Sequence, residues 1–157
     1  MDGNAESVDQ PSIQDHYIPD GVCFGCGPGN PKGLGLQSYP EGDRAVARWM
    51  PEEHHAAFPG VLNGGIVGVL IDCHSGAGLA WAHQRQEGLW PNSESPRWAT
   101  ASFEVKLRRP TPMDEPVELW AWATYLEVPK AEIQVELHSA GKLRAEGTAQ
   151  WSQLRPR

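Results

Sequence analysis

The chain has 157 residues, which is enough for one domain with a sizeable core. Apolar residues make up 39% of the sequence and charged residues 21%, and no apolar run approaches the roughly 18 residues of a membrane span. We therefore expect a soluble protein with no membrane partner. The formal net charge of −7 argues against general nucleic-acid binding, although a local basic patch could still hold a small anionic ligand.

The cysteine count and the first residues predict a cytoplasmic location. Three cysteines, an odd number, argue against a disulfide framework and fit a reducing compartment. The acidic, polar start of the chain predicts no signal peptide. Residues 1–20, with Pro11 and Pro19, are expected to form a polar, mobile tail before a single domain at 21–157.

In chain order, the hydrophobic pattern predicts short strands, one long helix and then four more strands. Before the helix come a stretch of turn formers at 23–33, two short strands at 35–39 and 43–49, and a helical turn at 51–58. The helix runs from about Gly64 to Ala82, because its apolar stretch is too long for a strand. A polar loop at 84–97 follows, and then strands at 99–108, 117–125, 133–138 and 143–151.

Asp72 interrupts the apolar helix, and it is the first candidate for chemistry. Carboxylates are rare in a core unless they are paired or functional, because burial removes their hydration. At the start of the same helix, Gly64 and Gly65 let a ligand approach unpaired amides whose dipoles favour negative charge. These amides could hold an oxyanion that forms when a carbonyl carbon is attacked. Asn63 is a preferred N-cap residue and could also add a side-chain donor.

The two ends of this candidate site are too far apart to act together within one chain. Asp72 lies nine residues after Asn63, which is roughly 13 Å along an α-helix. Two helices that pack antiparallel about a two-fold axis would bring the aspartate of one chain to the helix start of the other. A row of small residues around Asp72 would permit such close approach by a helix or a slender ligand. This row comprises Gly64, Gly68, Gly76 and Ala80.

Several short motifs follow one another between residues 23 and 155. They are Cys23-Phe24-Gly25-Cys26-Gly27 with Asn30-Pro31 and Gly33-Leu34, His55 through Pro59-Gly60, Asn63-Gly64-Gly65 with Asp72, Thr100-Ala101 leading to Arg108-Arg109-Pro110, and Gly141-Lys142-Leu143 running to Ala145-Glu146-Gly147-Thr148. In this order and spacing the chain resembles the PaaI-like acyl-CoA thioesterases of the hotdog superfamily. The resemblance implies an α+β hotdog fold, in which a curved antiparallel β-sheet wraps one long central helix. The family usually has a histidine at the position of Asn63.

The resemblance also implies an activity and roles for the candidate residues. The reaction would be hydrolysis of an acyl-CoA thioester to a free acid and coenzyme A, with Asp72 as general base or nucleophile. The oxyanion site, comprising Asn63, Gly64 and Gly65, would come from the partner chain of a homodimer, or of a dimer of dimers. Some family members place a threonine hydroxyl beside the acid, and Thr100 matches it. In a regular strand Thr100 would point to the opposite side from Phe103 and Val105. We therefore expect either a bulge or the dimer seam to bring Thr100 to the site.

Three further groups are candidates for substrate binding. By the family pattern His55 would line the site, although a loop histidine is the simpler alternative. Arg108 and Arg109, at a strand end, could hold the coenzyme A phosphates or could simply be solvated. The loop at 84–97 is long enough to act as a lid that closes Trp90 over an acyl chain, or it is a surface excursion.

Other functions remain open from the sequence. Cys23 and Cys26 with Cys73 and His74 could supply four zinc ligands, but a single CxxC is a weak signal. We therefore expect no metal, and no cofactor beyond the coenzyme A of the substrate. A non-catalytic protein that binds acyl-CoA or a small aromatic ligand is one alternative. A hydratase-like hotdog enzyme is another, although His74 does not share a helix face with Asp72. No Gly-x-Ser-x-Gly elbow supports an α/β-hydrolase mechanism.

Overall fold

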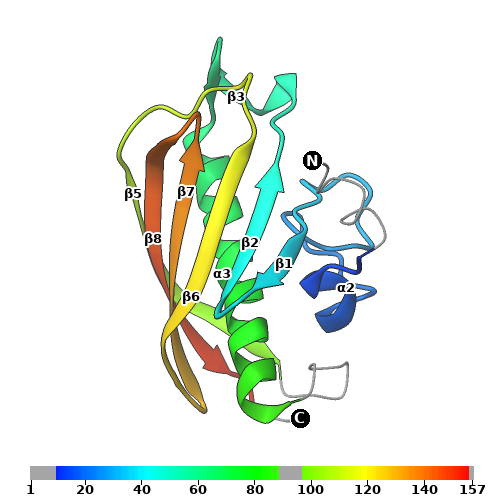
Figure 1. The fold of residues 1–157 in the computed structure, drawn as a ribbon. Helices are drawn as coiled ribbons and strands as arrows, with labels where there is room; N and C mark the ends of the chain where they lie inside the picture. Colours follow the sequence, from blue (N-terminus) through cyan, green and yellow to red (C-terminus); the bar gives the residue numbers. More distant parts are fainter. Residues whose placement is uncertain (1–9, 89–96, 156–157) are drawn as a thin grey trace.

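A single antiparallel sheet and one long helix form the body of the protein (Figure 1). The computed structural model describes residues 10–88 and 97–155. In spatial order the six strands of the sheet are β1 (Ser38–Glu41), β2 (Arg44–Trp49), β6 (Val117–Glu127), β7 (Lys130–Ser139), β8 (Lys142–Gln153) and β5 (Trp98–Leu107). The helix, α3 (Gly64–Glu87), packs along one face of this sheet. The architecture is the one that the sequence predicts.

Smaller elements flank the two ends of the sheet. A 3-10 turn, η1 (Glu53–His55), leads into a two-stranded sheet made of β3 (Ala56–Phe58) and β4 (Val61–Leu62), just before α3. A short helix, α2 (Ile13–Tyr17), lies beside β1 and also contacts α3 (Figure 1).

Alternating burial along the central strands explains how the sheet holds α3. On β6, Val117, Leu119 and Ala121 are buried while the residues between them are more exposed, which is the period-two pattern of a strand with one covered face. The facing residues of β7 and of the helix complete the core; they are Ile133, Val135, Leu137, Val67, Leu70 and Ile71. At Gly78 a Cβ atom would lie 2.9 Å from Ala121 Cβ, so glycine is what allows the helix to approach β6 this closely.

The amino-terminal segment differs from the tail that the sequence predicts. Residues 1–9 lie outside the described part of the chain, but α2 folds onto the body with Ile13 only 1% exposed. A capping box starts this helix, because Ser12 Oγ accepts from the Asp15 amide while the Asp15 carboxylate accepts from the Ser12 amide. One buried isoleucine and one cap therefore convert an apparently polar tail into part of the domain.

The helix α3 is longer than its apolar pattern indicates. It continues past Ala82 to Glu87 and ends at Gly88, whose φ of 77° is the left-handed conformation of a glycine C-cap. The last turn consists of Gln84, Arg85, Gln86 and Glu87, which are good helix formers without an apolar periodicity. The first part of the predicted loop is therefore helical, and Trp90 with the rest of the proposed lid lies outside the described residues.

The apolar character of α3 also bears on the membrane question. In length and composition this helix would suit a membrane span, with a mean hydropathy of 1.3 over 18 residues. Half of that window is buried within the fold, and the core helices of soluble proteins pass the same test. The apolar composition of α3 is explained by its contact with the sheet.

Candidate active site

Asp72 and Thr100 meet between α3 and β5. The hydroxyl of Thr100 donates to Asp72 Oδ1 at 2.8 Å. Burial raises the pKa of Asp72, and the hydrogen bond from Thr100 opposes part of that rise. The pair thus consists of a half-buried carboxylate and a fixed hydrogen-bond donor. These are the two residues that the sequence predicts at the centre of the site.

A β-bulge brings Thr100 to this position. The register of β5 against β8 shifts between Thr100, which pairs with Trp151, and Ser102, which pairs with Gln150. The extra residue, Ala101, reverses the alternation, so Thr100 points to the same side as Phe103 further along the strand. Of the two expected routes, a bulge or the dimer seam, the bulge is present and brings Thr100 to Asp72 within one chain.

Two cavities meet at Asp72. The first, here called the α2 cavity, has a volume of about 330 Å³ and runs under α2 between α3, β5 and β8. The second, the β5 groove, has a volume of about 460 Å³ and follows α3 from Asp72 back to its first residues. Asp72, Cys23 and Cys73 line both, so the carboxylate stands at the junction between a mostly apolar chamber and an open groove.

Aromatic side chains that sequence reasoning missed shape the α2 cavity. Tyr17, Trp98 and Trp151 line it. The Trp151 indole donates to Ser75 Oγ at 3.0 Å, and the Ser75 hydroxyl donates in turn to the Asp72 carbonyl at 2.6 Å. These two hydrogen bonds fix one wall of the cavity relative to Asp72. The tryptophans show no distinctive spacing in the sequence, so only the fold assembles them.

The start of α3 has the features of an anion site. Asn63 Oδ1 accepts from the Ile66 amide at 3.1 Å, which confirms the predicted N-cap. Within the described residues, the amides of Gly64 and Gly65 have no hydrogen-bond partner, and both glycines line the β5 groove. The groove therefore connects these unpaired amides with Asp72 along one face of the helix.

Arg108 and Arg109 follow the end of β5 at this same end of α3. Leu107, the last residue of β5, approaches Gly64, since a Cβ on the glycine would lie 3.3 Å from Leu107 Cδ1. The two arginines come next in the chain, and their amides both donate to the Arg144 carbonyl. Arg108 Nε also lies 3.3 Å from a carboxylate oxygen of Glu146.

His55 holds the loop before α3. Its buried Nδ1 accepts from the Glu52 amide at 2.9 Å, and its carbonyl accepts from the Asn63 amide at 2.9 Å. Burial lowers the pKa of His55. The imidazole lines neither of the two cavities that meet at Asp72.

His74 points away from Asp72 into a buried polar network. Its Nε2 lies 2.9 Å from the Ala45 carbonyl and must donate to it, so the neutral ring accepts at Nδ1 from Ser38 Oγ at 2.8 Å. Gln14 closes the network by donating to Ser38 Oγ at 3.0 Å and accepting from the Ser38 amide at 2.8 Å. Burial lowers the pKa of His74 to about 4. The ring is therefore unavailable both as a zinc ligand and as a partner of Asp72.

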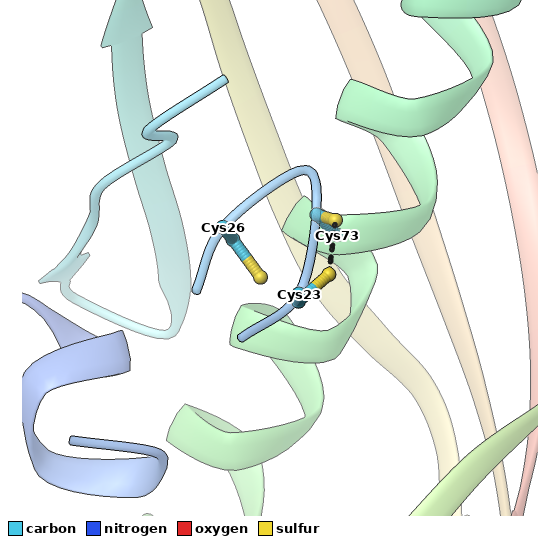
Figure 2. Close-up of side chains that lie close together, drawn as sticks. All are labelled: Cys23, Cys26 and Cys73. Atoms are coloured by element: carbon cyan, nitrogen blue, oxygen red, sulfur yellow. Dashed lines mark hydrogen bonds between the residues drawn. The ribbon is translucent and has the colours of Figure 1, made fainter. Parts of the chain in front are cut away.

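The three cysteines, by contrast, lie together beside Asp72. Cys23 and Cys26 come from the loop before β1 and Cys73 from α3, and Figure 2 shows their side chains pointing toward one another. The Sγ atoms of Cys23 and Cys73 are 3.7 Å apart. A hydrogen bond with Cys73 lowers the pKa of the Cys26 thiol, while burial opposes this change.

The chain is similar in fold to several proteins of known structure. A thioesterase superfamily protein from Shewanella loihica is 30% identical, and the match covers 82% of this chain and 98% of that one with a TM-score of 0.62. A mutant of the phenylacetic acid degradation protein PaaI from Thermus thermophilus is 24% identical over 77% of this chain and 95% of its own, with a TM-score of 0.60. An HP0420 homologue from Helicobacter felis shares the fold at 15% identity, with a TM-score of 0.68 and coverage of 95% and 94%. No protein-family model matches the sequence, and no curated protein does.

Proposed function

The chain belongs to the thioesterase superfamily and has its hotdog fold, and we propose that it hydrolyses an acyl-CoA thioester to a free acid and coenzyme A. The observation that carries this proposal is the half-buried Asp72 carboxylate, which accepts from Thr100 at the junction of two cavities. A carboxylate held by one donor keeps its second oxygen free to act on a water molecule or on the thioester carbon.

Asp72 would act in one of two ways. As a general base it takes a proton from water, and the resulting hydroxide attacks the carbonyl carbon; as a nucleophile it attacks that carbon itself and the anhydride is then hydrolysed. In both cases the C–S bond breaks, and the coenzyme A thiolate leaves and is protonated. Burial raises the pKa of Asp72, which makes its ionised form a stronger base than an exposed aspartate.

The oxyanion of the tetrahedral intermediate would be held by the helix start of a second copy. Asn63 lies roughly 13 Å and Gly65 roughly 10 Å from Asp72 along the same helix, so one chain does not place Asp72 and the helix start at one carbon. The unpaired amides of Gly64 and Gly65 lie in the open β5 groove, where a partner chain could reach them. We therefore propose a homodimer as the minimal active unit, with the side-chain amide of Asn63 as an additional donor.

The two cavities suit the two arms of the substrate. The α2 cavity, mostly apolar and lined by aromatic rings, would take the acyl group. Its volume of about 330 Å³ lies at the lower end of the range for small-molecule pockets, which favours a short-chain or single-ring acyl group. The pantetheine arm would leave along the β5 groove, and Arg108 and Arg109 beyond its end are candidates for the coenzyme A phosphates.

A panel of acyl-CoA substrates tests the proposal. Acetyl-, butyryl-, benzoyl- and palmitoyl-CoA would each be incubated with the protein, and released coenzyme A would be measured by chromatography, because the free cysteines would react with a thiol reagent. We expect turnover of the compact thioesters and little of palmitoyl-CoA. Asp72→Asn should reduce turnover by about 100- to 10,000-fold. Asp43→Asn, at the exposed β1–β2 turn, is the matched control and should keep wild-type rates.

The same panel separates the alternative functions. Tight binding of an acyl-CoA without any release of coenzyme A would mean a binding protein and would overturn the proposal. The environment of His74 disfavours a hydratase-like role. Both nitrogens of its neutral ring are hydrogen-bonded to β1 and β2, on the side of α3 away from Asp72. The free cysteines fit a cytoplasmic location, which we include in the proposal.

A further inference from the structure

The three thiols beside Asp72 have no part in the proposed hydrolysis, yet they form a compact donor set. The Sγ atoms of Cys23, Cys26 and Cys73 all lie within 4.8 Å of one another, and those of Cys23 and Cys73 are 3.7 Å apart. Figure 2 shows the three side chains together. Zinc binds thiolate sulfur at about 2.3 Å, so two sulfurs on a tetrahedral ion are roughly 3.8 Å apart. The distance between Cys23 Sγ and Cys73 Sγ matches this spacing, and Cys26 Sγ lies within 4.8 Å of both.

The loop that carries two of these thiols is built to lie directly on α3. A Cβ on Gly25 would overlap Cys73 Sγ and come within 2.7 Å of Val69 Cγ1, so only glycine permits this contact. A Cβ on Gly27 would overlap the backbone of Cys23. The approach of the loop to the helix therefore depends on the glycines that flank Cys26.

Backbone hydrogen bonds hold the loop in this position without any metal. The Gly27 amide donates to the Cys23 carbonyl at 2.9 Å, which closes the turn between the two cysteines. The Leu36 amide donates to the Gly25 carbonyl at 3.0 Å and ties the turn to the segment before β1. The three sulfurs are thus preorganised, and an ion would not have to order the loop first.

We propose that Cys23, Cys26 and Cys73 bind a zinc ion whose fourth position opens into the cavities beside Asp72. Three sulfur donors select a soft ion over magnesium or calcium. Each thiol loses its proton on binding, so up to three protons pass to solvent, and the affinity rises with pH. His74, the fourth ligand that the sequence suggests, is bound to Ser38 and Ala45 instead, which leaves water as the fourth ligand. Cys23 is exposed and gives the ion a path of entry.

Cobalt titration of the reduced, chelator-treated full-length protein tests this site. Cobalt replaces zinc in thiolate sites and gives an intense thiolate-to-metal absorption that a surface carboxylate site lacks. We expect this absorption to saturate at one equivalent per chain and to disappear when zinc is added. Cys26→Ser and Cys73→Ser should each weaken cobalt binding at least tenfold, while Asp72→Asn, which keeps all three sulfurs, should retain the absorption. Circular dichroism would establish that each variant folds. If Cys73→Ser, in the core helix, does not fold, Cys26→Ser in the loop still tests the site.

Three results would overturn the proposal. One is the lack of a thiolate-to-cobalt band at one equivalent, and another is an undiminished band in folded Cys26→Ser or Cys73→Ser. The third is a Cys23–Cys73 disulfide in protein purified without reductant, together with no cobalt binding after reduction, which would make the cluster a redox pair. The outcome is independent of the hydrolytic proposal, because metal binding is read by absorption and hydrolysis by release of coenzyme A.

Discussion

Removing the Thr100 hydroxyl is the most direct test of how the fold prepares Asp72 for catalysis. Thr100→Val keeps the β-branched shape on β5 and deletes only the group that donates to Asp72 Oδ1 at 2.8 Å. A hydrogen bond to a charged group contributes about 1.5–3 kcal/mol, and the lower end applies because the carboxylate is only half-buried. About 1.4 kcal/mol corresponds to a factor of ten. We therefore expect kcat/KM to fall roughly tenfold at any pH below the pKa of Asp72 in the wild-type protein, and by less at higher pH.

The pH dependence of kcat/KM identifies the cause of that loss. The Thr100 hydroxyl favours the ionised carboxylate, so its removal raises the pKa of Asp72 further. The acid limb of the pH profile should then move to higher pH, and activity should approach the wild-type rate on the alkaline side. Thr100→Ser is the matched control, because it keeps the hydroxyl and should leave the limb in place.

Two results would refute this reasoning. A loss of the same size at every pH would show that Thr100 acts on something other than the ionisation of Asp72. A wild-type profile in Thr100→Val would show that the hydrogen bond has no part in the reaction.

Three further predictions concern stability and assembly. Burial raises the folded-state pKa of Asp72 above 3.8, so the contribution of this carboxyl group to stability decreases as pH rises through that pKa. Asp72→Asn should therefore have a higher Tm than the wild type at pH 7, and the difference in Tm should narrow on acidification. The pKa of His74 is instead lowered from 6.5 to about 4, so stability falls as pH drops below 6.5. Denaturant titrations should show that the free energy of unfolding decreases by about 2 kcal/mol between pH 7 and 5, and that it decreases less in His74→Gln. Mixing inactive Asp72→Asn with Gly65→Pro, which removes a helix-start amide and crowds Asn63 Oδ1, should restore part of the activity through hybrid dimers. An active monomer at low concentration would contradict the shared site.

The parts of the site that follow from local pattern could be predicted from the sequence. The helix and its start follow from an apolar stretch opened by Asn63 and two glycines, and the N-cap bond to Ile66 is present. The contact of Asp72 with Thr100 follows from family resemblance. Strand parity indicates that this contact needs either a bulge or the dimer seam, and the bulge is present. Such features depend on neighbours within a few residues or on a strand of regular alternation.

The parts that depend on contacts distant in sequence could not be predicted. The sequence offers Cys73 with Cys23 and Cys26 only as a possible ligand set, because Cys73 lies 50 residues after Cys23 and no spacing rule places a helical thiol against so distant a loop. The segment around α2 has few apolar residues, Ile13, Tyr17 and Ile18, which are too few for a periodic pattern to indicate that α2 folds onto the body. Trp151 becomes a cavity wall only because β8 lies beside the bulge in β5.

The buried network around His74 determines how far α3 can turn or slide. The His74 ring, in the middle of the helix, is hydrogen-bonded to Ser38 of β1 and to the Ala45 carbonyl of β2, and Ser38 is bonded in turn to Gln14 of α2. Because these bonds are directional and enclosed, they fix both the rotation of the helix about its axis and its position along the sheet. Asp72 lies two residues away and inherits that orientation. Shortening the protein at residue 20 would remove Gln14 and leave only Ser38 and Ala45 to hold His74. The orientation of Asp72 toward Thr100 would then be less firmly fixed, although no residue of that pair had been changed.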